Sequence, residues 1–215
     1  MATCGAKGIS WSSSNTRSPE PRFSHHGKRW HYEDIVVEPA PVQKPHPPLW
    51  IGAFSPGSIR QAAEDGFNLL LGQNGSPELV AESIGVYRKA IEARGRVYDP
   101  MTVGLTRALH IAMNREEREA AHRLRMQFMR NVQQLSLSPA GDSPSLGRPR
   151  RALGEEEMRK ATETDALIGT PEEIIGRIER LRAGGVEYVL LIDVGGSLSA
   201  LRTFAREVMP QFTDK

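Results

Sequence analysis

Two serines three residues apart, Ser55 and Ser58, lie where the sequence predicts that a strand is followed by a helix. The preceding run Leu49–Ala53 is short and apolar, as a buried strand requires, and the helical pattern that follows ends at Gly66. The first N–H groups of a helix have no partner within it and its dipole favours negative charge, so this turn could bind an anion. Ser followed by Pro is also a common helix cap, and the residues alone leave both uses open.

Four predicted strand–helix pairs must position this turn. The strands are apolar runs at Leu49–Ala53, Phe67–Leu71, Thr102–Ala112 and Val186–Asp193. Helices are predicted to begin after the capping residues Ser55, Ser76, Asn114 and Thr170, and a last helix covers about Ser199 to Val208. Repeated βα units with short connections predict a parallel sheet, either in an open doubly wound fold or in part of a (β/α)8 barrel.

Two long segments carry more detailed expectations. The helix that begins at Asn114 is predicted to run to about Leu135, with Leu124 and Phe128 facing inward. Residues 136–168 include the run SLSPAGDSPSLGRPRRALG, which is rich in Pro, Gly and Ser. This composition predicts an exposed, mobile excursion without a buried face.

A β-hairpin is predicted upstream of the first strand. Arg22–Ser24 and Trp30–Val37 form its arms around a turn at His26 and Gly27, and a Pro-rich extended connector follows. The histidines here could suggest a metal site. Hairpin side chains alternate between faces, however, and no acid or Cys completes a ligand set at short spacing, so no metal is expected.

Composition excludes several classes of protein. The 215 residues include 39% hydrophobic and 25% charged residues, and the net charge of +2 comes from interspersed bases and acids. This pattern gives no support to nucleic-acid binding. Residues 1–21 are Ser-rich without periodicity and predict a disordered tail. A single cysteine, Cys4, and no apolar stretch of membrane length favour a reducing, cytoplasmic setting. The turn AFSPGS lacks the GxGxxG pattern, which disfavours a dinucleotide-binding dehydrogenase.

Three segments carry a family resemblance when taken in order. They are FSHHGKRWHYEDIVVEPAPVQKPHPPLWIGAFSPGSIRQAAEDGFNLL, then GTPEEIIGRIERLRAGGVEYVLL, and finally FAREVMPQF. Together they resemble the C-terminal half of the bacterial luciferase-like, flavin-dependent monooxygenase family. The resemblance covers about residues 22–212.

The resemblance implies a fold and a cofactor. The family has a (β/α)8 TIM barrel, of which residues 22–215 would supply the second four βα units, an incomplete barrel. Its members bind reduced flavin mononucleotide (FMN), or a deazaflavin in a sister branch. Ser55 and Ser58 match the hydroxyl pair that contacts the flavin phosphate, and the expected cofactor site also includes Phe54 and Gly57. Phe54 stands where some members carry an acid.

The resemblance also implies an activity, the insertion of one oxygen atom into a small organic substrate. The family's oxygen-chemistry residues belong to the first half, so no catalytic residue is assigned in this chain. A non-catalytic fragment of such an enzyme is the alternative. Half a barrel leaves two strand edges unpaired, so a second chain or a homo-oligomer is expected to close it.

Other residues at predicted strand ends are weaker candidates. Gln73 and Asn74 follow the second strand, and Asp193–Gly196 follow the last, so both turns could reach a ligand. His110 lies in the third strand and is expected to be packed or outward rather than a base. Trp50 is expected to fill a core, because a cofactor at the strand ends would lie beyond its reach.

Overall fold

The structure is a computed structural model that describes residues 22–28, 30–36, 38–39, 42–44, 47–135 and 153–213. The predicted tail, residues 1–21, lies outside the described residues, as do residues 136–152 of the predicted excursion. None of the helices among the described residues has the length and hydropathy of a membrane span.

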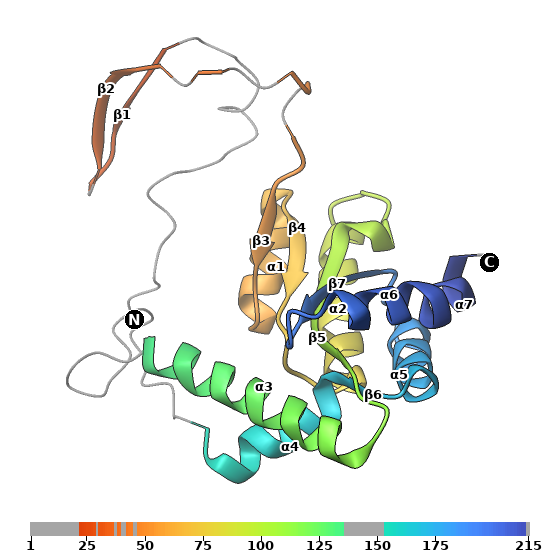
Figure 1. The fold of residues 1–215 in the computed structure, drawn as a ribbon. Coiled ribbons are helices and arrows are strands. Elements are labelled where there is room, and N and C mark those ends of the chain that lie inside the picture. The colour runs from red at the N-terminus through yellow and green to blue at the C-terminus, as the bar shows by residue number, and fades with distance from the viewer. Residues whose placement is uncertain are drawn as a thin grey trace.

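The predicted hairpin is confirmed, but its turn is displaced, because His26 belongs to the first strand and the N–H of Gly27 donates to the carbonyl of Trp30 at 2.9 Å. Val37, the predicted end of the second arm, lies outside the described residues. Strands β1 (Phe23–His26) and β2 (His31–Ile35) pair antiparallel, with His26 opposite His31. Nearly all of its residues are exposed, and Figure 1 shows the hairpin standing apart from the larger sheet.

A parallel sheet forms the centre of the fold, as predicted. Its strands are β3 (Trp50–Gly52), β4 (Asn68–Leu71), β5 (Val103–Ile111), β6 (Leu167–Gly169) and β7 (Tyr188–Asp193). Leu105 pairs with both β4 and β7, so these strands lie on opposite sides of β5. Leu109 pairs with both β6 and β7, so β6 lies on the β4 side, beyond the end of β4. The β3 and β7 edges do not meet, and the sheet is not closed into a barrel.

The helices surround this sheet on one face and at one end. They are α1 (Pro56–Asp65), α2 (Pro77–Glu92), α3 (Arg115–Leu135), α4 (Glu155–Asp165), α5 (Pro171–Ala183), α6 (Leu198–Thr203) and α7 (Pro210–Thr213). A short 3-10 helix, Pro100–Thr102, precedes β5. Figure 1 shows α3 and α4 lying across the end toward which the strands point. The last predicted helix is interrupted, because Phe204–Val208 adopts a π-helical turn between α6 and α7.

The main core lies between the sheet and helices α1 and α2. Leu69 and Leu105 are fully buried there, and Ile59 of α1 is 1% exposed. Burial of side chains this size stabilises the fold by about 1.5–3 kcal/mol each. Tyr87 of α2 adds a hydrogen bond, because its hydroxyl donates to the carbonyl of Phe67 at 2.8 Å. These contacts fix the helices behind the strands and the strand ends relative to each other.

The prediction of an irregular excursion over residues 136–168 is wrong for its described part. Residues 155–165 form α4, and Leu167 begins β6. Helix α4 buries only Met158 and Thr162, whereas its other positions are mostly charged or polar. Because α4 has so few buried positions and β6 has only three residues, neither element gives a clear periodic pattern in the sequence.

The predicted inward face of α3 is also wrong. Leu124 and Phe128 are 51% and 45% exposed, whereas the buried residues of α3 are Ala121, His122, Arg125 and Met129. Helix α3 packs against α4 and the ends of the strands rather than along the sheet, and this contact selects a different face. The consequence is that an arginine and a histidine occupy positions that the apolar pattern assigned to solvent.

The buried His122 predicts a pH dependence of stability. Burial lowers the pKa of His122 below its ordinary value, and the opposing pull of Glu119 is smaller. The unfolded chain therefore binds a proton more readily than the folded chain, and stability is expected to fall as the pH drops below about 6.5. Urea unfolding of the wild type and His122→Leu between pH 5 and 8 measures this loss, which the variant should lack.

Exposed His31 supplies the matched control, because it lies on the solvated hairpin. His31→Gln should keep the wild-type pH profile. The same change in the free energy of unfolding with pH in the wild type and in His122→Leu would contradict the prediction.

Candidate functional site

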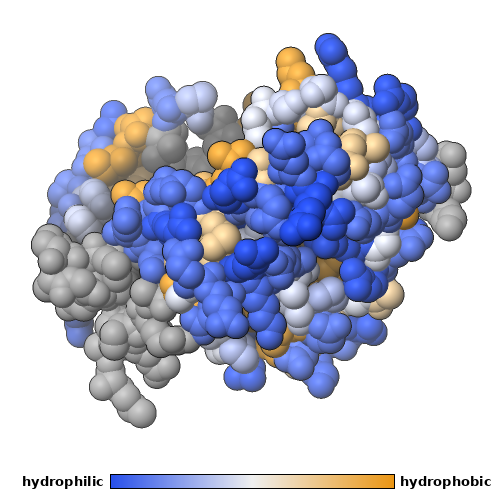
Figure 2. Space-filling model, turned by 60° about the horizontal axis from the view of Figure 1, so that its bottom comes forward, coloured by the Kyte–Doolittle hydropathy of each residue, from blue (hydrophilic) through white to orange (hydrophobic). Residues whose placement is uncertain are grey.

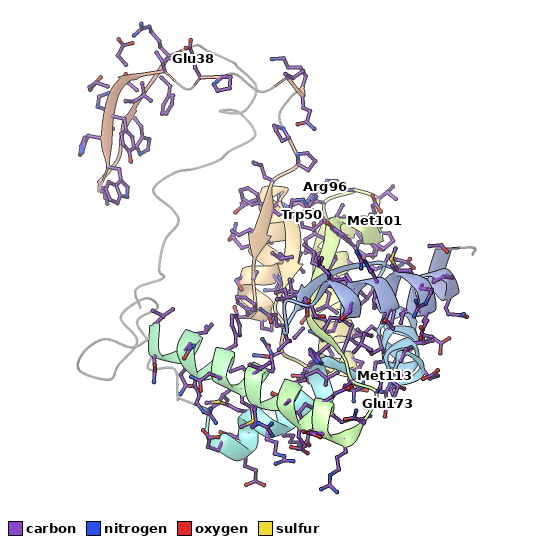
Figure 3. The ribbon with its side chains drawn as sticks, in the orientation of Figure 1. Glu38, Trp50, Arg96, Met101, Met113 and Glu173 are labelled. Carbon is purple, nitrogen blue, oxygen red and sulfur yellow. The ribbon has the colours of Figure 1, made fainter. Side chains whose placement is uncertain are left out.

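The turns that follow the parallel strands gather at one end of the molecule. They are Phe54–Ser58 after β3, Gly72–Gly75 after β4, Met113 after β5 and Asp193–Gly196 after β7. Figure 3 shows Met113 and Glu173 at this end, whereas Trp50, Arg96 and Met101 lie toward the opposite end. Ligands of parallel α/β folds bind at the carboxyl ends of the strands, so this end is the candidate site. We call it the mouth.

The predicted anion turn is the N-terminus of α1. Ser55 is the N-cap and Pro56 occupies the first helical position, as Ser-Pro favours. The hydroxyl of Ser55 accepts from the N–H of Ser58 at 3.2 Å, and the hydroxyl of Ser58 accepts from the N–H of Ser55 at 3.1 Å. Their two oxygens are 2.9 Å apart. The structure therefore brings the predicted pair together at an exposed helix start.

The expectation that the first N–H groups of this helix are available to an anion holds only in part. The N–H of Ser58 is satisfied by Ser55, and Pro56 has no N–H. Among the described residues, the N–H of Gly57 has no hydrogen-bond partner. The turn thus offers one free backbone donor and two hydroxyls whose present bonds are to each other and to the cap backbone.

Phe54 forms the side of the mouth between β3 and β4. Its side chain is 64% exposed, and its ring lies over Gly72. A Cβ at Gly72 would lie 2.7 Å from Cε1 of Phe54, so the absence of a side chain at Gly72 allows the ring this position. The ring therefore stands between the α1 turn and the turn after β4.

The turn after β4 is held from three elements. Arg107 of β5 donates to the carbonyls of Gly72 at 3.1 Å and Gly75 at 2.7 Å. Asp165, at the end of α4, accepts from the N–H of Gly75 at 2.7 Å. Arg125 of α3 donates to the side chains of Gln73 and Asn74 at 2.6 and 3.2 Å. The last two residues were predicted as weaker candidates, and the structure places them at the mouth.

Sequence reasoning missed Arg107 and Arg125, which are 1% and 4% exposed. Burial lowers the pKa of both guanidinium groups, and the charge of Asp165 opposes this shift. One signal was available for Arg107, a lone charge within the apolar strand VGLTRALHI. Arg125 gave no such signal, because it lies in a helix rich in charged residues.

The turn after β7 is closed by Asp193. Its carboxylate accepts from the N–H groups of Gly195 at 3.0 Å and Ser197 at 2.7 Å, so Asp193 caps the turn as well as bordering the mouth. His110 is half-buried at the end of β5 and packs against Gly195, where a Cβ would lie 2.9 Å from its ring. Nδ1 of His110 is buried without a partner among the described residues.

Trp50 lies away from the mouth, but the prediction that it fills a core is wrong, because it lies on the sheet face opposite α1 and α2 and is 39% exposed. Its ring packs edge-on against Tyr188 with centroids 5.7 Å apart, and it approaches Gly104. Figure 3 shows it on β3 far from Met113 and Glu173. In the described part of the chain, no three His, Cys, Asp or Glu side chains lie close enough together to hold a metal ion.

A cavity of about 200 Å³ opens at the mouth between α3 and β7. Its lining residues are Ala108, Leu124, Arg125, Phe128, Ile192, Asp193 and Val194. Figure 2 turns this end toward the viewer and shows a mostly hydrophilic surface with separate hydrophobic residues. A second cavity of about 360 Å³ lies beside α2 and α5 and is lined largely by charged side chains.

Comparison with known proteins identifies relatives of this chain. The family model "Luciferase-like monooxygenase" matches residues 11–188. The oxygenase component of a flavin-dependent trigonelline monooxygenase from Acinetobacter baylyi is 28% identical over 212 residues, which cover 89% of this chain and 56% of that protein. An FMNH2-dependent dimethylsulfone monooxygenase from Pseudomonas putida is 26% identical, covering 89% of this chain and 53% of that protein. The chain spans about half the length of these curated relatives.

Solved structures confirm the predicted fold class. An F420-dependent secondary alcohol dehydrogenase matches with a TM-score of 0.67 and 15% identity, covering 94% of this chain and 59% of the other. The oxygenating constituent of 3,6-diketocamphane monooxygenase from Pseudomonas putida, in complex with FMN, matches with a TM-score of 0.57 and 17% identity, covering 91% and 59%. The sheet is therefore an unclosed part of a luciferase-like (β/α)8 barrel.

The geometry of the α1 turn predicts a measurable structural role for Ser55. Ser55→Ala removes the cap of the Ser58 N–H and should lower the free energy of unfolding by about 0.5–2 kcal/mol. Urea denaturation measures this change. Ser83→Ala is the control, because Ser83 lies within α2 and only donates to the carbonyl of Leu79. An equal effect of the two substitutions would contradict the capping role.

Proposed function

This chain belongs to the luciferase-like monooxygenase family, and we propose that it forms the cofactor-phosphate side of a flavin-dependent monooxygenase. The proposal rests on the α1 turn, where Ser55, Gly57 and Ser58 present polar groups at the mouth of this part of a luciferase-like barrel. The activity of the whole enzyme is part of the proposal, because the chain spans about half of its relatives.

The α1 turn suits a phosphate group for three reasons. Among the described residues the N–H of Gly57 is free, and both serine hydroxyls can turn toward an anion when Ser55 gives up its bond to the Ser58 oxygen and Ser58 gives up its bond to the carbonyl of Ser55. The helix dipole adds about 0.3–1 kcal/mol for a negative charge at this end. Among the described residues, no acid lies within the first turn of α1 to repel it.

The remaining groups at the mouth would position the cofactor and exclude water. Phe54 provides an apolar surface beside Gly72, close to the proposed phosphate site. Reduced flavin, when bound, supplies the electrons for inserting one oxygen atom into a small organic substrate. A reducing, cytoplasmic setting, expected from the single Cys4, fits the use of a reduced cofactor.

FMN binding tests the cofactor site. The chain should bind FMN about tenfold or more tightly than riboflavin, which lacks the phosphate, since hydrogen bonds to a charged group contribute about 1.5–3 kcal/mol. The double substitution of Ser55→Ala with Ser58→Ala should remove most of this difference and leave riboflavin binding unchanged. Fluorescence titration measures both affinities, and a parallel titration with a deazaflavin cofactor decides between the two cofactors.

Ser76→Ala is the matched control, because Ser76 caps α2 before Pro77 just as Ser55 caps α1 before Pro56. It should leave FMN affinity unchanged. Absence of FMN and deazaflavin binding by the folded wild-type chain would overturn the proposed function.

The open sheet also favours the proposal that a second chain closes the barrel. Leu70, Gly104 and Leu190 share the face opposite α1 and α2, together with Trp50. Trp50 is 39% exposed, and the β3 and β7 edges are not joined to each other. Parallel sheets normally have both faces covered. We propose that a second copy of this chain covers this face.

Symmetry makes this closure geometrically simple. All strands of the five-stranded sheet are parallel, and β3 and β7 lie at opposite edges. A twofold axis along the strand direction places β7 of one copy beside β3 of its partner in the parallel sense. Both edges are then paired, which removes the aggregation hazard of open strands.

Sedimentation equilibrium tests the closure. The wild-type chain should be a dimer at micromolar concentration, and Trp50→Glu should shift it to monomer, because the charge would be buried without a partner. Trp30→Glu, on the exposed hairpin, should leave the dimer intact. A wild-type monomer would contradict closure by a second copy.

A further inference from the structure

The two amide side chains after β4, Gln73 and Asn74, have an orientation that Arg125 fixes. A guanidinium group donates hydrogen bonds and accepts none, so the amide oxygens of Gln73 and Asn74 must face Arg125. Their NH2 groups therefore point away from it. In the part of the chain that the structure describes, neither NH2 group has an acceptor. The turn thus presents two amide donors at the mouth.

The charge behind these donors is positive. Arg107 and Arg125 are both buried, and among the described residues Asp165 is the one carboxylate that acts on both of them. Arg125 forms its hydrogen bonds with neutral amides only, and among the described residues it has no ion pair. A buried cation with neutral partners is costly, and an anion nearby lowers that cost.

An apolar cavity adjoins this positive region. Arg125 lines it together with Leu124, Phe128 and Ile192, and its guanidinium lies 5.3 Å from the ring centroid of Phe128. The volume of about 200 Å³ exceeds the roughly 150 Å³ of an apolar cavity that binds benzene. The carboxylate of Asp193 at the far wall is already bound to the N–H groups of Gly195 and Ser197.

We propose that this part of the mouth binds an organic anion with an apolar or aromatic body. Its carboxylate would accept from the NH2 groups of Gln73 and Asn74 in the field of Arg125, and its body would enter the cavity against Phe128 and Leu124. The inference rests on the proposed function, since such an anion would be the substrate of the flavin-dependent reaction. Arg125 is a positioning residue in this arrangement, because it acts through the two amides.

Binding of benzoate to the wild-type chain tests the proposal, with benzamide and benzylamine as neutral and cationic analogues of the same shape. At about 0.15 M salt, where exposed charges are largely screened, benzoate should bind at least tenfold more tightly than either analogue. Isothermal titration measures the three affinities without cofactor. Equal affinities, or no binding of benzoate, would overturn the proposal.

Asn74→Asp is the decisive variant, because it keeps the shape of the side chain and its bond to Arg125. It replaces the outward donor with a carboxylate that neutralises the arginine, so the preference for benzoate over benzamide should disappear. Asn131→Asp adds the same charge on α3 and keeps its bond from Gln127, so the preference should persist. An unchanged preference in Asn74→Asp would overturn the proposal.

FMN binding measured in the same samples separates this inference from the proposed function. Flavin binding without a preference for benzoate overturns the anion site alone. A preference for benzoate without binding of FMN or deazaflavin overturns the flavin-dependent function and leaves the anion site standing.

Discussion

The pairing of β5 with its neighbours determines the rest of the structure. This nine-residue strand pairs with β4 and β7 along its first part and with β6 near its end, and β3 is held in turn by β4, so every parallel strand takes its position from β5 directly or through β4. Parallel pairing brings the carboxyl ends of all these strands to one end of the sheet. The turns that carry Ser55, Asn74 and Asp193 therefore meet at the mouth, although 138 residues (193 − 55) separate the first from the last.

Sequence reasoning predicted the elements whose signals are local. Ser55, Ser76 and Thr170 each precede a proline, and each caps a helix as expected. The apolar runs that became β4 and β5 were also predicted, with ends displaced by about one residue. These features depend on steric limits and hydrogen-bond needs of a few adjacent residues, which a single sequence displays directly.

The errors concern features that depend on distant partners. Helix α3 exposes Leu124 and Phe128 because α4 and the strand ends occupy its other face, and nothing local indicates that contact. The role of Arg125 was hidden for the same reason, since its partners Gln73 and Asn74 lie about 50 positions away. The serine pair was predicted from the sequence, but the mutual capping of Ser55 and Ser58 depends on the conformation of the turn, which the residue types alone do not determine.

The open sheet face around Trp50 and the proposed anion site at the mouth place different demands on the fold. Covering the face around Trp50 requires strands beyond those that pair in this sheet, whereas the donors at the mouth are held by β5, α3 and α4 of this chain alone. Arg107 binds the backbone of the turn after β4 while Arg125 binds its side chains, so backbone position and amide orientation have separate supports. A turn held in this way does not depend on the covering strands for its geometry. The polar side of the mouth is therefore already organised in the open sheet, and closure would supply its opposite wall and exclude water.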